Sequence, residues 1–269
     1  MDSAPNLPKY KRPPVIEVVC GVQFDPLPGF TSLHFGEFWH RIKENYPKAE
    51  DKPPLDDLRE AAEGTQVKTD LVADIPPLRR VWYIDSSRNF LIQLQPSRFL
   101  SNWRKVRAED EYPSYATAFD RFLNEWTGFL GFANDTGLSP IHTNQYELTY
   151  INHILEAEQP YPAGIARHLP LFSWESAQSS KFLPAPQSAA LSFQFLVPEA
   201  KGRLHATISH GSRQSDKKGV LVIDLTARGA AKEDWSDMKE WFSMAHEWIV
   251  CGFTDLTSRE SHQLWERER

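Results

Sequence analysis

The sequence predicts an α+β fold in which antiparallel sheets pack against two long helices. Two groups of short alternating segments support this, one at residues 81–95 and one at residues 189–227. A long amphipathic segment belongs to each group, at residues 112–132 and 234–251. Because strands run together before a helix and do not alternate singly with helices, the pattern favours antiparallel sheets over a parallel one.

We expect three parts: an extended N-terminal arm over residues 1–14, a first α+β half over 15–155 and a second over 156–269. Together they are expected to form one compact unit of 269 residues. The helix segments FLNEWTGFLGFAND and FSMAHEWIVCGFTD both end in an apolar run followed by Gly-Phe and an Asp. Helix ends converge on glycine for conformational reasons, so a relationship between the halves is a hypothesis. Their strands would form one continuous sheet or two facing ones.

The first half opens with the clearest strand of the chain, at residues 15–24. One face of it is apolar throughout: Ile16, Val18, Cys20, Val22 and Phe24. After a proline- and glycine-containing turn, the apolar spacing predicts a helix that begins near Thr31 or Ser32. Residues 47–77 are charged and proline-broken, and we expect a long connection there, with one weak segment at 71–75.

The middle of the chain alternates again. Residues 81–84 and 90–95 are expected to be strands joined by a polar turn, and the longer one ends at Pro96, because proline cannot donate to a sheet ladder. A helix is expected at 112–132 and a further strand at 142–155.

The second half begins with a proline- and serine-rich stretch that contains a short helix at 163–168. Strands at 189–197, 203–209 and 220–227 are separated by turns, a pattern typical of an antiparallel meander. The last long helix follows at 234–251. The sequence Thr-Ser-Arg-Glu at 257–260 then indicates a capped short helix.

Composition excludes several classes of protein. The net charge of -6 argues against broad, sequence-independent DNA binding. No apolar run approaches the length of a membrane span. Cys20 and Cys251 are the two cysteines, and each is most simply a buried thiol. Without a disulfide framework, the cytoplasm is the expected compartment.

The sequence carries no recognisable catalytic, metal-binding or phosphate-binding motif, so we predict no catalytic residue, no metal and no cofactor. It lacks C-x-x-C, H-E-x-x-H, G-x-x-x-x-G-K, G-x-G-x-x-G and G-x-S-x-G. Glu199 and Lys201 could sit beside a metal-bound phosphate in a nuclease, but their context favours a hairpin turn. Arg203 and His210 bracket a strand, which does not suit a ribonuclease helix.

Residues 88–107 combine a buried-type strand with basic and aromatic side chains. The candidate binding residues are Gln93, Gln95, Arg98, Asn102, Trp103, Arg104 and Lys105. One interpretation is a polar binding surface at the end of a strand, since arginine binds carboxylate or phosphate and aromatic rings offer stacking. The other is that Phe99, Leu100 and Trp103 fill the core while the basic groups lie in solvent. Glu17, on the mixed face of its strand, needs a partner, and an arginine of this cluster is a candidate.

Four segments together, PPVIEVVCGVQFDPL, QLQPSRFLSNWRK, YPSY and ELTYINHI, resemble an uncharacterised, sporadically distributed bacterial family of about this length. The resemblance runs over most of the chain and brings no assigned activity or catalytic residue. The family's patchy distribution implies genes that travel, as components of antiviral defence or mobile-element systems do.

Our leading hypothesis is a non-catalytic binding module that acts through a protein partner in a bacterial cytoplasmic complex. Nine tryptophans motivate it, because aromatic and arginine anchors dominate protein interfaces. The alternative is a nucleic-acid or phosphate-ligand binder centred on residues 98–107, which the net charge disfavours. A nuclease or other enzyme comes third, and no membrane partner is expected.

Overall fold

The structure is a computed structural model. It describes residues 7–56, 58–60, 67–68, 78–155, 163–171, 188–212, 218–231 and 235–268.

One antiparallel sheet of nine strands organises the molecule, in the order β2-β5-β6-β7-β1-β8-β11-β10-β9. The first half supplies β1 (Val15–Phe24), β2 (Lys48–Lys52), β5 (Arg80–Ile84), β6 (Phe90–Gln95) and β7 (Arg98–Arg104). The expected boundary after residue 155 would leave β8 (Thr143–Leu155) in the first half; because the strand pattern repeats from β8, we count it with the second half from here on. The second half then also supplies β9 (Ala190–Val197), β10 (Gly202–Ser212) and β11 (Gly219–Ala230). A separate two-stranded ladder joins β3 (Leu58–Arg59) to β4 (Val67–Lys68). The α+β prediction is therefore confirmed, with one continuous main sheet.

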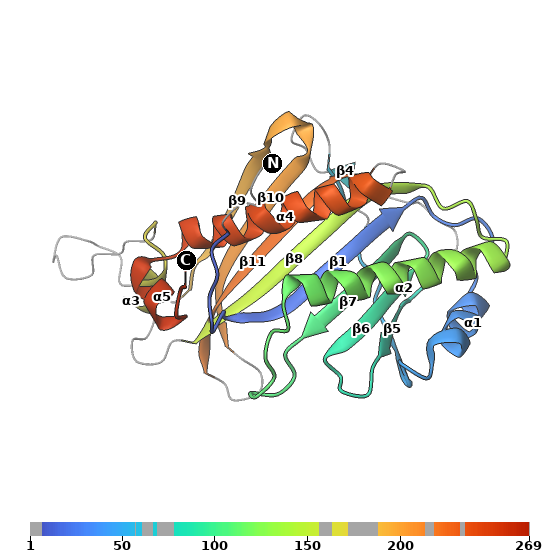
Figure 1. Cartoon of the computed structure of the whole chain (residues 1–269), viewed down its shortest axis with the longest axis horizontal. Helices are drawn as coiled ribbons and strands as arrows, with labels where there is room; N and C mark the ends of the chain where they lie inside the picture. The colour runs from blue at the N-terminus through green and yellow to red at the C-terminus, as the bar shows by residue number, and fades with distance from the viewer. Residues whose placement is uncertain are drawn as a thin grey trace.

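Two long helices, α2 (Tyr115–Asp135) and α4 (Trp235–Leu256), lie on the same face of this sheet (Figure 1). The shorter helices are α1 (Ser32–Ile42), α3 (Ala163–His168), α5 (Arg259–Leu264) and the 3-10 turn η1 (Pro198–Ala200). The described part of the chain contains no helix that is long and apolar enough to cross a membrane.

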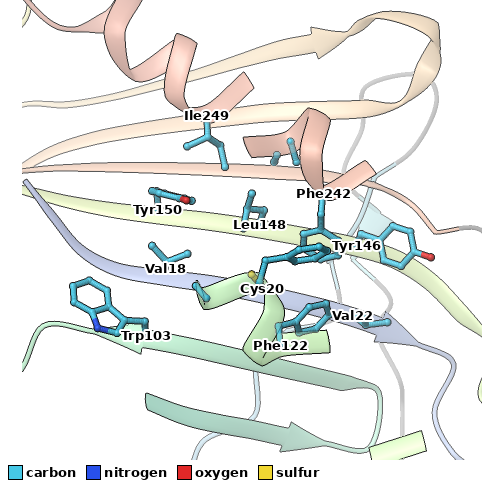
Figure 2. Close-up of a cluster of buried hydrophobic side chains, with 14 of the residues drawn as sticks. Val18, Cys20, Val22, Trp103, Phe122, Tyr146, Leu148, Tyr150, Phe242 and Ile249 are labelled. Carbon is cyan, nitrogen blue, oxygen red and sulfur yellow. The ribbon is translucent and has the colours of Figure 1, made fainter. Parts of the chain in front are cut away.

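The core fills the space between the sheet and the two long helices (Figure 2). Val18, Cys20 and Val22 of β1 are at most 1% exposed and point toward the helices. Phe122 of α2 and Phe242 of α4 meet above them with ring centroids 5.2 Å apart. Full burial of each such side chain contributes about 1.5–3 kcal/mol, so this interface dominates the stability of the fold.

Apart from β2 and the β3–β4 ladder of the first half, the described elements of the two halves have the same connectivity. Each begins with a strand, β1 or β8, that pairs with the last strand of a later three-stranded meander, β5-β6-β7 or β9-β10-β11. The long helix of each half follows at once. β1 and β8 pair with each other at the centre of the sheet, for example Cys20 with Leu148. Common ancestry of the halves stays a prediction.

Most predicted elements are confirmed, and the differences have physical reasons. The expected connection over 47–77 contains β2, whose sequence KAEDK shows no apolar alternation because it is a short, exposed edge strand. The weak segment expected at 71–75 lies outside the described residues. α2 begins three residues later than expected, because the Ser114 side chain accepts a hydrogen bond from the Thr117 amide at its N-terminus. α4 continues past Cys251, whose side chain is only partly buried, so the prediction of a buried thiol holds for Cys20 alone.

Candidate functional site

The structure divides the predicted binding residues between the two faces of the sheet. Trp103 is 3% exposed and packs on the helix side, where its ring lies 5.4 Å from that of Tyr112. Gln93, Gln95, Arg98, Asn102 and Arg104 belong to the opposite face, since they alternate with core residues along β6 and β7. Lys105 follows the end of β7 and is exposed. These residues therefore do not form one continuous surface. The local pattern could not show this, because residues 98–107 were not expected to contain a second strand.

Three of the predicted binding residues already bond to the chain's own backbone: Arg104 Nε donates to the Arg88 carbonyl at 3.1 Å, and Gln95 and Arg98 hold a more distant segment. We call residues 55–56 and 58–60 the crossing segment, because they bond to strands from β6 to β10 on the face opposite the long helices. Gln95 Oε1 accepts from the Leu55 amide at 3.1 Å, and Gln95 Nε2 donates to the Leu55 carbonyl at 3.2 Å. Arg98 donates to the Asp56 carbonyl at 3.1 Å and to Gln23 Oε1 at 2.7 Å. Gln145 on β8 exchanges a similar pair of bonds with the Glu60 amide and the Leu58 carbonyl, each at 2.9 Å.

The crossing segment ends on a charged cluster of the second half. Glu60 accepts hydrogen bonds from His205 at 2.5 Å and from Arg203 at 3.2 Å. Burial alone would raise the pKa of Glu60, but these two partners hold it below its usual value. Nearby, Arg228 donates to Glu147 at 2.6 Å, and the pKa of Glu147 is likewise lowered despite its burial. These groups pair with one another, so the arrangement is that of a structural ion-pair network.

Glu17 has a different partner from the one expected. Its carboxylate accepts a hydrogen bond from Asn102 Nδ2 at 2.6 Å, and Asn102 Oδ1 in turn accepts from Gln93 at 2.8 Å. Burial raises the pKa of Glu17, while the Asn102 bond and the charge of Arg104 act against that rise. An amide thus binds Glu17, and the arginine acts only through its charge.

A basic and aromatic group lies on the same face, near the β2 edge. We call it the Trp82 cluster: Trp82, Lys52, Arg80 and Arg104. The Lys52 ammonium lies 4.6 Å from the Trp82 ring centroid, and the guanidinium carbons of Arg104 and Arg80 lie at 5.3 and 5.6 Å. The Trp82 indole and Arg80 both donate to Gln93 Oε1, at 3.0 and 2.7 Å. Three cations around one ring form a surface suited to an anionic or aromatic ligand.

The two edges of the sheet differ strongly. β2 is five residues long and carries Lys48, Glu50, Asp51 and Lys52. β9 has eight residues, ALSFQFLV, none of them charged, and it pairs within the described chain only with β10. Leu196 is 62% exposed and Phe195 is 38% exposed. Charged, short edge strands resist pairing with other chains, whereas a long uncharged edge invites it.

An apolar groove of about 460 Å³ lies beside this edge, between α4 and the strands β9 and β10; we call it the β9 groove. Its apolar lining is Leu171, Phe195, Leu204, Trp248, Cys251 and Leu256. Sequence analysis found the β9 strand but did not identify it as an edge, because the order of strands in a sheet is not a local property of the sequence. The absence of charge in ALSFQFLV was the available signal.

No set of three or more His, Cys, Asp and Glu side chains lies close enough to hold a metal ion within the described ranges.

No protein-family model and no curated protein matches the sequence. Among solved structures, the crystal structure of DynU16, described as a protein in the dynemicin biosynthetic locus, aligns over 89% of this chain and 97% of that one. Its TM-score is 0.27 and its sequence identity 10%, values at which the likeness carries no argument.

Proposed function

We propose that this chain is a non-catalytic binding module whose protein partner adds an extended strand to β9. The observation that carries the proposal is the long, uncharged and exposed β9 edge. An edge strand offers a row of backbone donors and acceptors, and a partner strand gains affinity from them. The β9 groove beside the edge would receive an apolar side chain of the partner, which supplies specificity. Aromatic rings of Trp248 and Phe195 suit such an anchor.

The setting of this module is part of the proposal. We place it in a bacterial cytoplasmic complex, in agreement with two free cysteines, and we connect it to antiviral defence or mobile-element systems through the family resemblance. The absence of a recognisable catalytic motif in the sequence agrees with a binding role.

Charging the β9 edge tests the proposal. Ser192 and Leu196 are both exposed on β9, so the double substitution Ser192→Lys/Leu196→Lys should leave the free energy of unfolding within about 0.5 kcal/mol of wild type. Ala49→Lys on the exposed β2 edge is the matched control. The partner is captured from a bacterial host, identified and purified, and its affinity is measured for all three proteins.

We expect the β9 variant to bind at least about tenfold more weakly and the β2 variant to bind like wild type. Hydrogen exchange should show that the partner protects the β9 amides. Equal affinity of the β9 variant and the wild type would contradict the proposal. A wild-type dimer in light scattering that the β9 substitutions dissociate would assign the edge to a second copy of this chain instead.

The Trp82 cluster favours a second candidate, a nucleic-acid or phosphate-ligand binder. Three partly exposed cations surround one indole ring, and two of the predicted binding residues, Gln93 and Arg104, take part. A single-stranded oligonucleotide would place a base on Trp82 and phosphates on the cations.

The test measures oligonucleotide affinity against salt concentration. If this candidate is correct, Arg104→Gln should reduce the slope of log K against log salt by about 1, because it removes one phosphate contact. Lys239→Gln, on the exposed side of α4, should leave the slope unchanged. Absence of salt-dependent binding for wild type would exclude this candidate.

A further inference from the structure

A second cavity lies on the helix side of the sheet. It borders the same stretch of α4 as the β9 groove but through different residues, His246, Ile249 and Phe253 instead of Trp248, Cys251 and Leu256. It has a volume of about 480 Å³, within the range of roughly 300–1,000 Å³ that small-molecule sites occupy. Five parts of the chain converge on it: the N-terminal arm, the start of α2, strand β8, strand β11 and the second half of α4. We call it the Tyr–His cavity, after Tyr112, Tyr115, Tyr150 and His246.

The walls are mostly apolar, but the cavity holds polar groups to which the described residues offer no hydrogen-bond partner. The Tyr115 hydroxyl is buried and makes no hydrogen bond to any described residue. A buried hydroxyl without a partner costs about 1–3 kcal/mol, so such a group calls for an explanation. A bound ligand that hydrogen-bonds to it provides one.

His246 adds a second unused group. Its ring stacks on that of Tyr115, with centroids 3.9 Å apart and planes 8° apart, and lies 6.1 Å from the ring of Tyr150. Burial lowers the pKa of His246 to about 4, so the imidazole is neutral at pH 7 and offers one donor and one acceptor nitrogen. Within the described part of the chain, the imidazole makes ring contacts but no hydrogen bond.

The other side chains that line the cavity indicate the polarity and charge of the ligand that would fit it. The hydroxyls of Tyr112 and Tyr150 bond to each other at 2.8 Å and complete a polar wall. Leu225 and Ile249 are at most 1% exposed and supply an apolar floor; Figure 2 shows Ile249 close to Tyr150 between α4 and the sheet. Because charged side chains occur only on the arm at the mouth, a charged ligand group inside the cavity would lose its hydration without compensation.

The N-terminal arm runs beside α4 (Figure 1), and its residues Pro8, Tyr10 and Pro13 line the cavity on that side. Tyr10 secures it: its hydroxyl lies 2.9 Å from that of Thr254, and its ring meets that of Phe253 edge-on. The arm's backbone is hydrogen-bonded to the C-terminal segment. The Lys11 amide donates to the Glu266 carbonyl at 3.2 Å, and the Glu268 amide donates to the Lys9 carbonyl at 2.8 Å. The cover is thus attached to the chain's end and to α4.

We infer that the Tyr–His cavity binds a neutral, largely apolar small molecule that carries a hydroxyl or carbonyl group, with that group bonded to Tyr115 and His246. The apolar floor holds the body of the ligand, and the unused hydroxyl and imidazole select its polar group. This site is separate from the β9 edge, so either proposal can fail without the other.

The test uses three probes of equal ring size: 2-naphthol, naphthalene and 2-naphthoate. Calorimetric titration of the wild-type chain at neutral pH should show binding of 2-naphthol about tenfold tighter than that of naphthalene, since naphthol alone satisfies the buried groups. Naphthoate, which is charged, should bind most weakly. Tyr115→Phe should weaken 2-naphthol about tenfold and leave naphthalene unchanged, because it removes only the hydroxyl.

Two further variants keep the test decisive. Leu225→Phe fills the cavity floor and should abolish binding of both neutral probes; Trp248→Ala, in the β9 groove, should change neither. Thermal unfolding of each variant establishes that it is folded, and Tyr115→Phe serves alone if Leu225→Phe does not fold. The proposal is overturned if wild type does not bind 2-naphthol, if naphthalene binds as tightly, or if Tyr115→Phe leaves the naphthol affinity unchanged.

Discussion

The first and second halves of the sheet share one connectivity but are covered differently. In the first half, the connection after β1 carries α1, and Phe38 of α1 packs against Tyr83, Phe99 and Phe129. In the second half, the connection after β8 carries α3, which packs on α5 instead. The described residues of this connection, 163–171, leave the β9 groove beside α4, with Leu171 at its wall. The cover of each half therefore depends on one connecting segment, and the open half is where we place the partner.

The long helices differ in a related way. The buried residues Phe122 and Phe129 of α2 recur as Phe242 and Ile249 of α4 when the two helix segments are aligned from their first residues. In this alignment Trp126 corresponds to His246. Trp126 is 1% exposed and packs in the core, whereas the smaller imidazole lines the Tyr–His cavity. The first half is thus filled where the second half keeps space.

Removing a ring from each half should show this difference most strongly. Phe38→Ala creates a cavity in the covered half and should lower the free energy of unfolding by about 3–5 kcal/mol. Trp248→Ala in the open half removes a partly exposed ring and should cost about 1 kcal/mol or less. Urea unfolding followed by circular dichroism measures both, and equal losses would contradict the comparison.

The pH dependence of stability should reveal His246. Its pKa is near 6.5 in the unfolded chain and about 4 in the fold, where the rings of Tyr115 and Tyr150 face it and burial causes the shift. Between these values the unfolded chain binds more protons, so stability falls as the pH falls, by up to about 3 kcal/mol.

The matched variant for this pH effect is His246→Phe, which keeps a ring at position 246, the counterpart of Trp126, but cannot titrate. The free energy of unfolding, measured from pH 7 down to pH 4, should fall less steeply for this variant than for wild type. Lowered pKa values of Glu60 and Glu147 add an acid dependence common to both proteins. Parallel curves for the two would show that His246 does not contribute.

A smaller effect should distinguish the buried ion pairs that join the crossing segment to the second half from the exposed ion pair on β2. Glu60→Gln leaves Arg203 and His205 without their carboxylate and should cost about 1–3 kcal/mol. Glu50→Gln breaks the exposed pair with Lys52 on β2, and its effect should stay within about 0.5 kcal/mol. Thermal unfolding of both variants in low and high salt distinguishes the two ion pairs. Salt screens the exposed pair, so the effect of Glu50→Gln on the melting temperature should shrink, whereas the effect of Glu60→Gln should barely change.

Part of this molecule follows from local sequence. The alternation of residues 90–95 correctly placed Gln93 and Gln95 opposite Phe90, Ile92 and Leu94, because successive strand side chains point to opposite faces. The long helices followed from their apolar spacing, and the antiparallel meander from its turns. Each of these rests on interactions between residues near one another in the chain.

The tertiary structure decided the rest. KAEDK became β2 through pairing with β5, although it lacks an apolar pattern. Trp103 entered the core, while Arg98 and Gln95 bound the backbone of the crossing segment, about 40 residues away in sequence. The order of strands set which edge is exposed and brought Tyr115, Tyr150 and His246 to one cavity. Such contacts depend on which distant segments meet, and side-chain periodicity reports only the face on which each residue lies.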